Sequence, residues 1–333
     1  MTGPRHRAKR RAALRALVVF GAALAPRIAP AQAQASTRPY RIGLLTVGHT
    51  PYVDDFIRAL RRLGYVEGRN AVLERRNAEN RPARLPQLAA ELVRLEVDVL
   101  VAPDPPSAAA AKAATAAIPI VMRSSNDPVE AGLVASLSRP GGNVTGVYSI
   151  YDELTAKRLS ILKEALPSLA LVGVLWTSRR AGAARNWREA DRAAQALGAR
   201  LHSMDVGDAA ALEPAFAAAR DAGSAAVLTL RSPLIVAQRR RIIELAARMR
   251  LPTMFDERQF VDDGGFMSYG ASLADLYGQL AAYVDKILKG ARPAEMPVEQ
   301  AAKFELAVNL RTARAIGATI AQSVLLRADR VIE

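Results

Sequence analysis

Three groups of polar residues follow apolar runs in the first half of the chain, where strands of a parallel sheet are expected to end. The groups are Gly48-His49-Thr50, Asp104-Pro105-Pro106-Ser107 and Ser124-Ser125-Asn126-Asp127. In an open parallel sheet, a ligand sits outside the carboxyl ends of the strands, beside helix N-termini with free N–H groups. These imidazole, hydroxyl, carboxylate and amide groups could therefore hold a small polar ligand through hydrogen bonds.

Several of these residues also fit a purely structural role. The motif DPVE at residues 127–130 has the pattern of a helix start, with Asp127 as N-cap and an acid completing a capping box. Ser232, which precedes a proline, repeats this arrangement in the second half. His49 is a lone loop histidine, for which a hydrogen bond within the protein and a ligand contact both remain open.

Aromatic side chains make up only 5% of the chain, so their positions are informative. Tyr148 and Tyr151 lie near an expected joint between two halves, Tyr269 lies near another, and Trp176 ends an expected strand. A tyrosine at such a joint can stack on a ligand and also hydrogen-bond it. Packing within the joint is the alternative for these rings.

Enzyme signatures are missing from the sequence. It has no dinucleotide fingerprint, no phosphate-binding P-loop, no H-E-x-x-H zinc motif and no nucleophile elbow. Three histidines and no cysteine leave little material for a transition-metal site. Catalysis by carboxylates such as Asp104 or Asp256 would need a pair, and no spacing suggests one. We therefore expect neither an enzyme nor a bound metal or cofactor.

The elements that position these residues alternate between short apolar runs and helical patterns, which indicates parallel β-α-β units. Strands are predicted at 41–47, 97–102, 118–122, 171–176, 225–230, 266–270 and 305–309, and helical patterns at 53–63, 85–93, 161–165, 234–249 and 273–289. Continuous apolar strands are expected where helices cover both faces of a sheet. The predicted fold is α/β, with two Rossmann-like lobes.

The two series of elements predict a joint near residues 147–152. The last third has too few elements for a core of its own, so it must add to both lobes and cross between them. We expect lobe 1 at 36–147 plus about 268–300, and lobe 2 at 148–267 plus about 301–333. Multiple crossings make a hinge.

Residues 1–35 have the pattern of a cleavable export signal, with a basic start, an apolar run over 16–25 and a small-residue end at Ala33-Gln34-Ala35. Ten apolar residues are about half of a membrane span. The pair Arg10-Arg11 leaves the general and the twin-arginine export routes both open. This segment holds seven of the 46 Lys and Arg residues and no acid, so its removal lowers the net charge from +14 to +7. The remaining bases are spread out, which argues against nucleic acid as a partner.

Five longer stretches of the chain are more specific than any single motif above. They are LGYVEGRN (63–70), LPQLAAELV (85–93), DPVEAGLVASLSRPGGNVTG (127–146), GGFMSYG (264–270) and YVDKILKGARPAEMPVEQ (283–300). In these stretches the chain resembles the TrpX-like ABC transporter substrate-binding proteins, which have the type 1 periplasmic binding fold. The resemblance runs over nearly the whole chain after the predicted signal.

The resemblance implies a two-lobed periplasmic receptor that passes an amino acid or similar ligand, possibly aromatic, to a membrane permease and its ATPase. It implies that the three first-lobe loops line one side of the site. It places Tyr148, Trp176, Ser232, Asp256 and Tyr269 opposite them. Two departures from the family pattern are Asp104-Pro105-Pro106 in place of a small Gly/Thr-rich loop, and Ser232 in place of an aspartate. Because Ser232 lacks the carboxylate of that aspartate, the expectation that this position binds an ammonium group of the ligand is weakened.

Three other functions remain open from the sequence. A receptor of the same fold could serve a sensor or chemoreceptor instead of a transporter. An exported hydrolase or isomerase would need a convergent acid/base pair. A repressor would need a helix-turn-helix before residue 41, where the apolar run argues against one. We expect a monomer, because the lobes must move freely.

Overall fold

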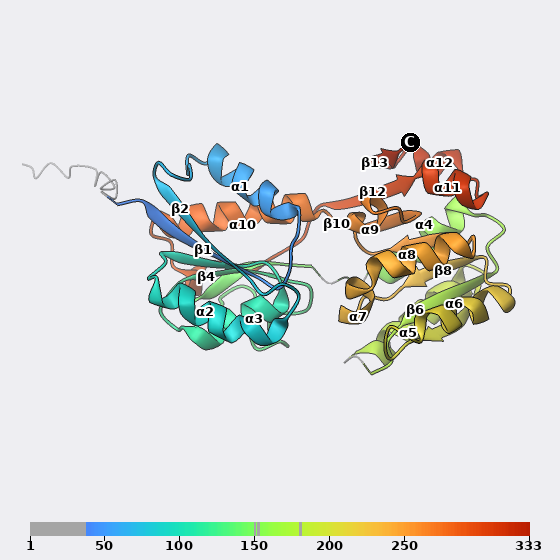
Figure 1. Ribbon diagram of the computed structural model, residues 1–333, viewed down its shortest axis with the longest axis horizontal. Coiled ribbons are helices and arrows are strands. Elements are labelled where there is room, and N and C mark those ends of the chain that lie inside the picture. The colour runs from blue at the N-terminus through green and yellow to red at the C-terminus, as the bar shows by residue number, and fades with distance from the viewer. Residues whose placement is uncertain (1–37, 150, 152–153, 180–181) are drawn as a thin grey trace, which may run out of the picture. The chain divides into compact units, whose positions relative to one another are not determined.

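The computed structural model describes residues 38–149, 151, 154–179 and 182–333, so the predicted export signal lies outside the described residues. Strands and helices alternate along the chain and form two sheets, each with helices on both faces (Figure 1). The fold is α/β with two lobes, as predicted. Nearly all neighbouring strands pair in parallel, which explains the continuous apolar runs in the sequence.

The first sheet contains, within the described residues, six strands in the order β11-β5-β4-β3-β1-β2. They are β1 (Tyr40–Thr46), β2 (Ala71–Asn77), β3 (Val99–Ala102), β4 (Ile120–Ser124), β5 (Val144–Tyr148) and β11 (Glu299–Gln300). The associated helices are α1 (Tyr52–Arg62), α2 (Leu85–Arg94), α3 (Pro105–Ala114) and α10 (Leu273–Leu288), with short 3-10 turns at Pro82–Arg84 and Pro293–Glu295.

The second sheet has the order β13-β12-β10-β9-β8-β6-β7 in the described part of the chain. Its strands are β6 (Leu171–Trp176), β7 (Arg200–Asp205), β8 (Ala226–Thr229), β9 (Thr253–Phe255), β10 (Met267–Ala271), β12 (Phe304–Asn309) and β13 (Arg330–Ile332). Its helices are α4 (Thr155–Ala165), α5 (Ala183–Ala196), α6 (Leu212–Asp221), α7 (Pro233–Ala237), α8 (Arg239–Arg248), α9 (Arg258–Asp262), α11 (Leu310–Ile316) and α12 (Gln322–Leu325). Only the β10–β12 pair is antiparallel among the pairings described.

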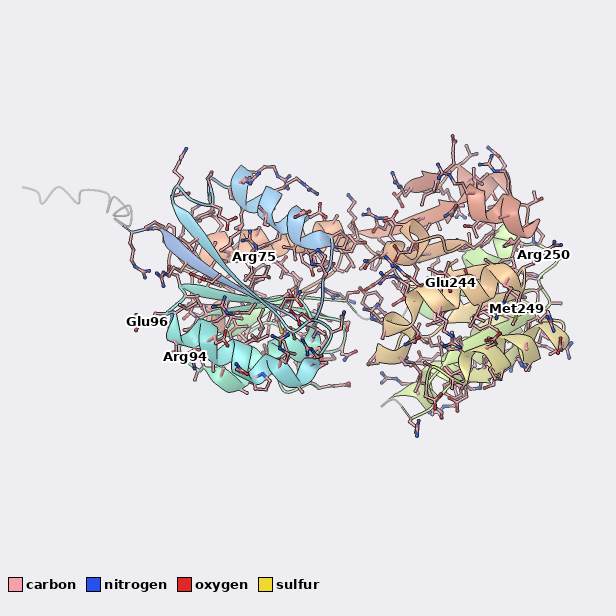
Figure 2. The ribbon with its side chains drawn as sticks, viewed as in Figure 1. Arg75, Arg94, Glu96, Glu244, Met249 and Arg250 are labelled. Atoms are coloured by element: carbon pink, nitrogen blue, oxygen red, sulfur yellow. The ribbon has the colours of Figure 1, made fainter. Side chains whose placement is uncertain are left out.

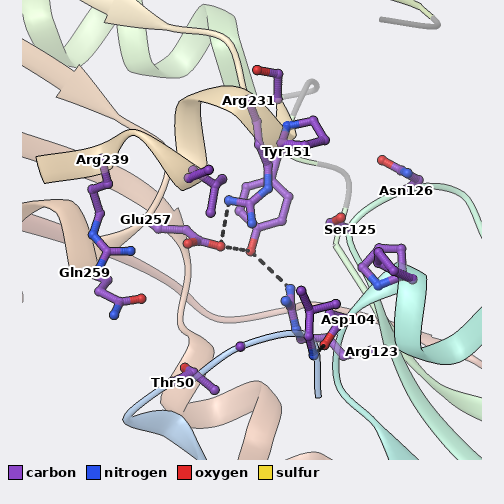
Figure 3. Close-up of a pocket in the computed structure, with 18 of the residues that line it drawn as sticks. Thr50, Asp104, Arg123, Ser125, Asn126, Tyr151, Arg231, Arg239, Glu257 and Gln259 are labelled. Carbon is purple, nitrogen blue, oxygen red and sulfur yellow. Dashed lines mark hydrogen bonds and ion pairs between the residues drawn. The ribbon is translucent and has the colours of Figure 1, made fainter. Parts of the chain in front are cut away.

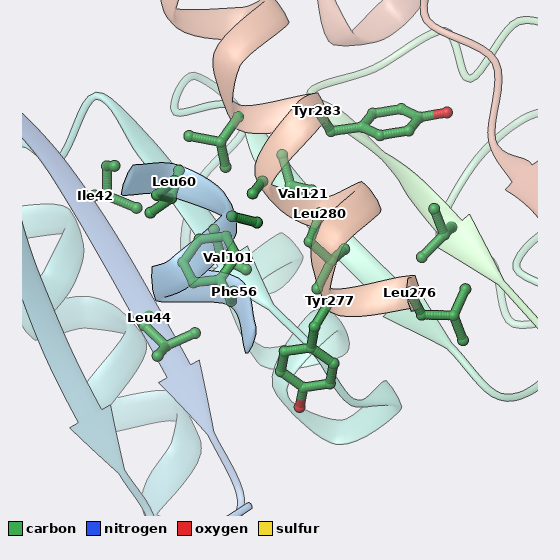
Figure 4. Packing of buried hydrophobic residues seen from close by; sticks show 14 of the residues in the cluster. Ile42, Leu44, Phe56, Leu60, Val101, Val121, Leu276, Tyr277, Leu280 and Tyr283 are labelled. Atoms are coloured by element: carbon green, nitrogen blue, oxygen red, sulfur yellow. The ribbon is translucent and has the colours of Figure 1, made fainter. Parts of the chain in front are cut away.

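Each sheet has an apolar core on both faces. On one face of the first sheet, α1 and α10 pack Phe56, Leu60, Leu276 and Leu280 against strand residues such as Val101 (Figure 4). Helices α2 and α3 cover the other face. Charged side chains such as Arg94 at the end of α2 and Glu244 on α8 are exposed (Figure 2). Amphipathic helices therefore bury one face on each sheet, as their spacing predicts.

The chain passes between the sheets three times in the described structure: from β5 to α4, from β10 to α10, and from β11 to β12. The multiple crossings predicted from the last third of the sequence are thus present. Strand β10 pairs with β9 and β12, so residues 267–271 belong to the second sheet, and the crossing falls at Ser272, slightly later than expected. No helix in the described ranges is long and apolar enough to span a bilayer.

One sequence-based prediction of a helix is wrong. Residues 128–132 after Asp127 form turns and not a helix. Asp127 Oδ1 does accept hydrogen bonds from the N–H groups of Val129 (2.7 Å) and Glu130 (3.3 Å), as an N-cap would. The backbone then reaches Gly132 with a φ of 66°, which ends the turn before an α-helix can propagate.

A carboxyl group is buried on β12 of the second sheet. Glu305 is 8% exposed, and one of its oxygens has no hydrogen-bond partner among the described residues. Arg258 Nη1 lies 3.3 Å from the other oxygen, and Arg258 also stacks over the ring of Tyr52 at 5.7 Å. Burial raises the pKa of Glu305, and Arg258 only partly offsets this rise.

We therefore predict that ionisation of Glu305 lowers the free energy of unfolding as pH rises. A carboxyl group with a raised pKa in the folded state binds its proton more tightly than in the unfolded chain, so folding stability falls as pH increases above about 4.5. Glu305→Gln should gain stability over the wild type at pH 7.5 but match it near pH 4, as measured by urea unfolding. Glu295→Gln, at an exposed position, should track the wild type at both pH values. A Glu305→Gln variant with the same stability as the wild type at both pH values would contradict the prediction.

Candidate functional site

A pocket of about 1830 Å³ is lined by loops that follow strands of both sheets (Figure 3). From the first sheet come the loops after β1, β3 and β4, and from the second sheet the loops after β8 and β9. Of the thirteen ligand-binding residues predicted from the sequence, seven line it: His49, Thr50, Asp104, Ser125, Asn126, Asp127 and Ser232. Tyr151, for which the sequence left ligand contact and packing both open, lines it as well. The rule that ligands sit at the carboxyl ends of parallel strands thus points to a real cavity in this chain.

Asp104 has both of its carboxylate oxygens engaged by backbone groups. It is the N-cap of α3, accepting a hydrogen bond from the N–H of Ser107 at 2.9 Å. Its other oxygen accepts from the N–H of Val47, at 3.2 Å. Asp104 therefore joins the loop after β1 to the start of α3, and it holds two walls of the pocket together.

Ser232 is the N-cap of α7, which follows β8 of the second sheet, as the sequence predicts. Its Oγ accepts from the N–H of Ile235 at 3.2 Å and lies 3.2 Å from the hydroxyl of Thr177. The side chain is 3% exposed but still forms part of the pocket wall. The capping role is therefore present, and it does not exclude a contact with a ligand.

Three predicted aromatic residues do not line the pocket. Trp176 stacks on Trp187 at 5.0 Å and donates from its indole nitrogen to Ser203. Tyr269 stacks on Phe304 at 6.2 Å. Tyr148 is 7% exposed and packs in the core beneath α2 and α3. A role in ligand binding for these three stays a prediction.

Three predicted polar residues also lie outside the pocket lining. Ser107 is fully buried at the start of α3. Ser124 Oγ donates to the carbonyl of Asn126 and accepts from its N–H, which shapes the loop after β4. Asp256 is 1% exposed and forms an ion pair with Arg231. These residues support the loops that do line the pocket, and their predicted ligand contacts stay untested.

A network of charged and phenolic side chains lies at the pocket wall, and most of it was missed by sequence reasoning (Figure 3). Arg123 Nη1 donates to the Tyr151 hydroxyl at 3.5 Å, which donates to Glu257 Oε1 at 3.2 Å. Arg231 Nη1 lies 2.7 Å from both Glu257 Oε1 and Asp256 Oδ2. The Arg231 guanidinium also stacks over the Tyr151 ring at 4.6 Å. We call these five residues the buried charge network.

The charge states in the buried charge network follow from its geometry. Burial and the neighbouring Glu257 raise the pKa of Tyr151, so its hydroxyl stays protonated and can donate. Burial opposes the charge of Arg231, but Glu257 and Asp256 together raise the pKa of its guanidinium. The network therefore combines two guanidinium cations and a neutral phenol with the two acidic side chains that pair with Arg231.

Tyr277 on α10 is a further aromatic residue of the pocket wall that the sequence reasoning did not single out. Burial, together with Asp104 and Glu257, raises its pKa to about 12, although Arg123 and a hydrogen bond with Thr50 act in the opposite direction. Tyr277 therefore presents a neutral phenol between the loop after β1 and the buried charge network.

The pocket offers hydrogen-bonding and charged groups. Within residues 38–149, 151, 154–179 and 182–333, no group of three or more histidine or carboxylate side chains is placed to hold a metal ion. The lining combines prolines and aliphatic residues with polar loop ends. Such a mixture suits a small ligand that has both apolar and polar parts.

Comparison with known proteins gives a consistent result over most of the chain. Residues 48–332 match the model of the family described as ABC transporter substrate binding protein. A tyrosine-binding protein of Clostridioides difficile is 27% identical over 286 residues, which cover 84% of this chain and 82% of the relative.

Solved structures of similar fold cover 88% of this chain. A conserved domain protein from Vibrio cholerae has a TM-score of 0.77 at 28% identity, and all of that chain is covered. A domain from Streptococcus pneumoniae in complex with L-Trp has a TM-score of 0.76 at 24% identity, again with that whole chain covered. The ligand-free, open form of an adhesive substrate-binding protein from Clostridium difficile has a TM-score of 0.69 at 23% identity, with 99% of that chain covered.

Proposed function

Since the chain belongs to the family of ABC transporter substrate-binding proteins, we propose that it captures a small amino acid or amino-acid-like ligand for import. The observation that carries this proposal is the pocket lined by strand-end loops of both sheets. A receptor that closes around its ligand needs such shared walls, because each lobe must contribute contacts in the closed form.

We place the ligand's polar groups on the loops of the first sheet, where Thr50, Ser125 and Asn126 present hydroxyl, amide and backbone N–H groups. His49, Asp104 and Asp127 complete that side, and Ser232 faces the pocket from the second sheet. The phenols of Tyr151 and Tyr277 add two neutral aromatic groups to the same pocket. The relatives named above as tyrosine-binding and as complexed with L-Trp make aromatic amino acids the first ligands to test.

The size of the pocket supports closure on binding. A pocket for one small molecule typically measures about 300–1,000 Å³. The pocket of about 1830 Å³ is larger than this range, so one amino acid would leave much of it filled with water. Movement of the lobes about the crossings would shrink the space around the ligand, and the closed form would then be presented to the permease.

The proposal includes the setting in which the protein acts. We propose that residues 1–35 direct export to the periplasm and are removed, and that the partners are a membrane permease and its ATPase. Lobe 1 would comprise 36–147 and about 272–300, lobe 2 would comprise 148–271 and about 301–333, and the protein would act as a monomer. The ligand would leave chemically unchanged, since the pocket serves binding and not catalysis.

A thermal-shift screen of residues 36–333 tests this function. The panel contains amino acids, small carboxylates, purines and sugars, with calorimetry on each hit and chemical analysis of the recovered ligand. A ligand at a hundred times its dissociation constant should add about 2.7 kcal/mol of stability. A saturable hit recovered unchanged supports the receptor function. A hit that is converted to product would contradict it and favour an exported hydrolase or isomerase.

A further inference from the structure

Arg123 is a buried cation at the pocket wall that has no carboxylate partner among the described residues. It stands near the end of β4 and is 6% exposed. Its Nε donates to the carbonyl of Pro103 at 2.8 Å, and its Nη1 reaches the Tyr151 hydroxyl only at 3.5 Å. Among the described residues, no carboxylate oxygen lies within 4.0 Å of its guanidinium nitrogens. Buried charges in proteins are normally paired, so this one lacks an expected counterion among the residues that the structure describes.

The acids around Arg123 are already engaged by other groups. Glu257 pairs with Arg231 and accepts from Tyr151, while Asp104 accepts from two backbone N–H groups. Arg231, the other guanidinium of the buried charge network, has two carboxylates at 2.7 Å. Within the described part of the chain, counterions are therefore present for Arg231 and absent for Arg123.

The position of Arg123 places its unpaired charge where a ligand would bind. Arg123 lines the pocket, two residues before Ser125 in the loop that follows β4. Figure 3 shows its side chain beside Asp104, with Ser125 and Thr50 on neighbouring loops of the same wall. An anion that meets Arg123 would therefore lie in the same pocket as the hydroxyl groups of Thr50 and Ser125.

We propose that Arg123 binds the carboxylate of the ligand and determines the specificity of the pocket for carboxylate-bearing compounds. This inference rests on the proposed function, which it deepens by naming the group recognised and the residue that recognises it. A planar guanidinium can meet a carboxylate with two parallel N–H···O bonds. The ligand would then supply the counterion that the described residues do not.

The test compares L-tyrosine with L-tyrosinamide, which differ only in the carboxylate. Wild-type protein should bind L-tyrosine at least about 30-fold more tightly than the amide in calorimetry, because loss of one partner of a buried charge pair costs this much or more. In Arg123→Gln, affinity for L-tyrosine should fall by a similar factor, and the preference for the acid over the amide should nearly vanish. Arg76→Gln, which breaks an ion pair with Glu91 in the same sheet but outside the pocket lining, is the matched control and should retain both affinities.

If Arg123→Gln lowers the affinity for L-tyrosine and for L-tyrosinamide by the same factor, the preference for the acid stays intact. That result would overturn the proposal and leave Arg123 with a structural role. Acetate provides a test that does not depend on the proposed function. If L-tyrosine fails to bind the wild type, the proposal of an amino-acid ligand is contradicted. Acetate should still raise the melting temperature of the wild type above its value in chloride at equal ionic strength. That rise should be absent in Arg123→Gln. An identical response of both proteins would overturn the proposal for Arg123.

Discussion

Replacing Arg231 with methionine should lower the free energy of unfolding by about 3–5 kcal/mol, which is the range for removing one partner of a buried ion pair. The side chains of Asp256 and Glu257 are 1% and 6% exposed, and Arg231 lies 2.7 Å from both. Without the guanidinium, two acidic side chains would remain buried with no cation within 4.0 Å among the described residues, and Tyr151 would lose the group stacked on its ring. Urea unfolding at neutral pH measures the loss.

Two further variants show whether this loss comes from the buried charges. In the double variant Arg231→Met/Glu257→Gln, one of the two buried acids left without Arg231 is replaced by a neutral amide. The double variant should therefore be more stable than Arg231→Met alone. Arg220→Met removes an exposed partner of Asp221 and should cost less than about 1 kcal/mol. Equal losses for Arg231→Met and Arg220→Met would contradict this account of the network.

Gly146→Ala should destabilise the first sheet by about 4 kcal/mol or more, which is at the upper end for single substitutions. Gly146 lies in β5 with a φ of 141°, a conformation that residues with a Cβ atom rarely adopt. An added Cβ would lie 2.0 Å from the carbonyl oxygen and 2.7 Å from the nitrogen of Met122 in β4. Because both neighbours are backbone atoms of a paired strand, the clash can be relieved only by separating β4 from β5.

The matched control for this substitution is Gly142→Ala in the same glycine-rich run. Gly142 is exposed, and an added Cβ there would meet no atom within 4 Å. This variant should unfold like the wild type or be slightly more stable, since alanine restricts the unfolded chain. Thermal unfolding of the two variants side by side distinguishes them. A Gly146→Ala protein as stable as Gly142→Ala would show that the β4–β5 contact is not tight.

Much of the fold could be predicted from sequence because parallel strands covered on both faces leave unbroken apolar runs. The predicted strands at 97–102 and 171–176 match β3 and β6 to within two residues. Strand β2, with the sequence AVLERRN, escaped notice because it is an edge strand with charged side chains. The predicted helix at 234–249 is two helices, α7 and α8, which meet at Gln238.

The site could be predicted only in part, for a physical reason. Loop residues that follow strands, such as Thr50 and Ser125, are found by the general rule for parallel sheets. The buried charge network joins residues far apart in the chain, as Tyr151 and Glu257 are separated by 106 positions, and no local spacing reveals such a pair. Arg123 did carry a signal, since it is a single arginine at the end of an apolar run just before a predicted site loop.

The central claim, that the pocket closes on a small ligand, is tested most directly by a distance across it. The chain has no cysteine, so Glu130→Cys and Arg240→Cys give two unique positions for spin labels on exposed residues of the pocket lining. Pulsed electron paramagnetic resonance would be recorded without ligand and with saturating L-tyrosine, or with the strongest hit from the screen. We expect a shorter and narrower distance distribution with ligand. An unchanged distribution at a ligand concentration that calorimetry shows to be saturating would contradict the account.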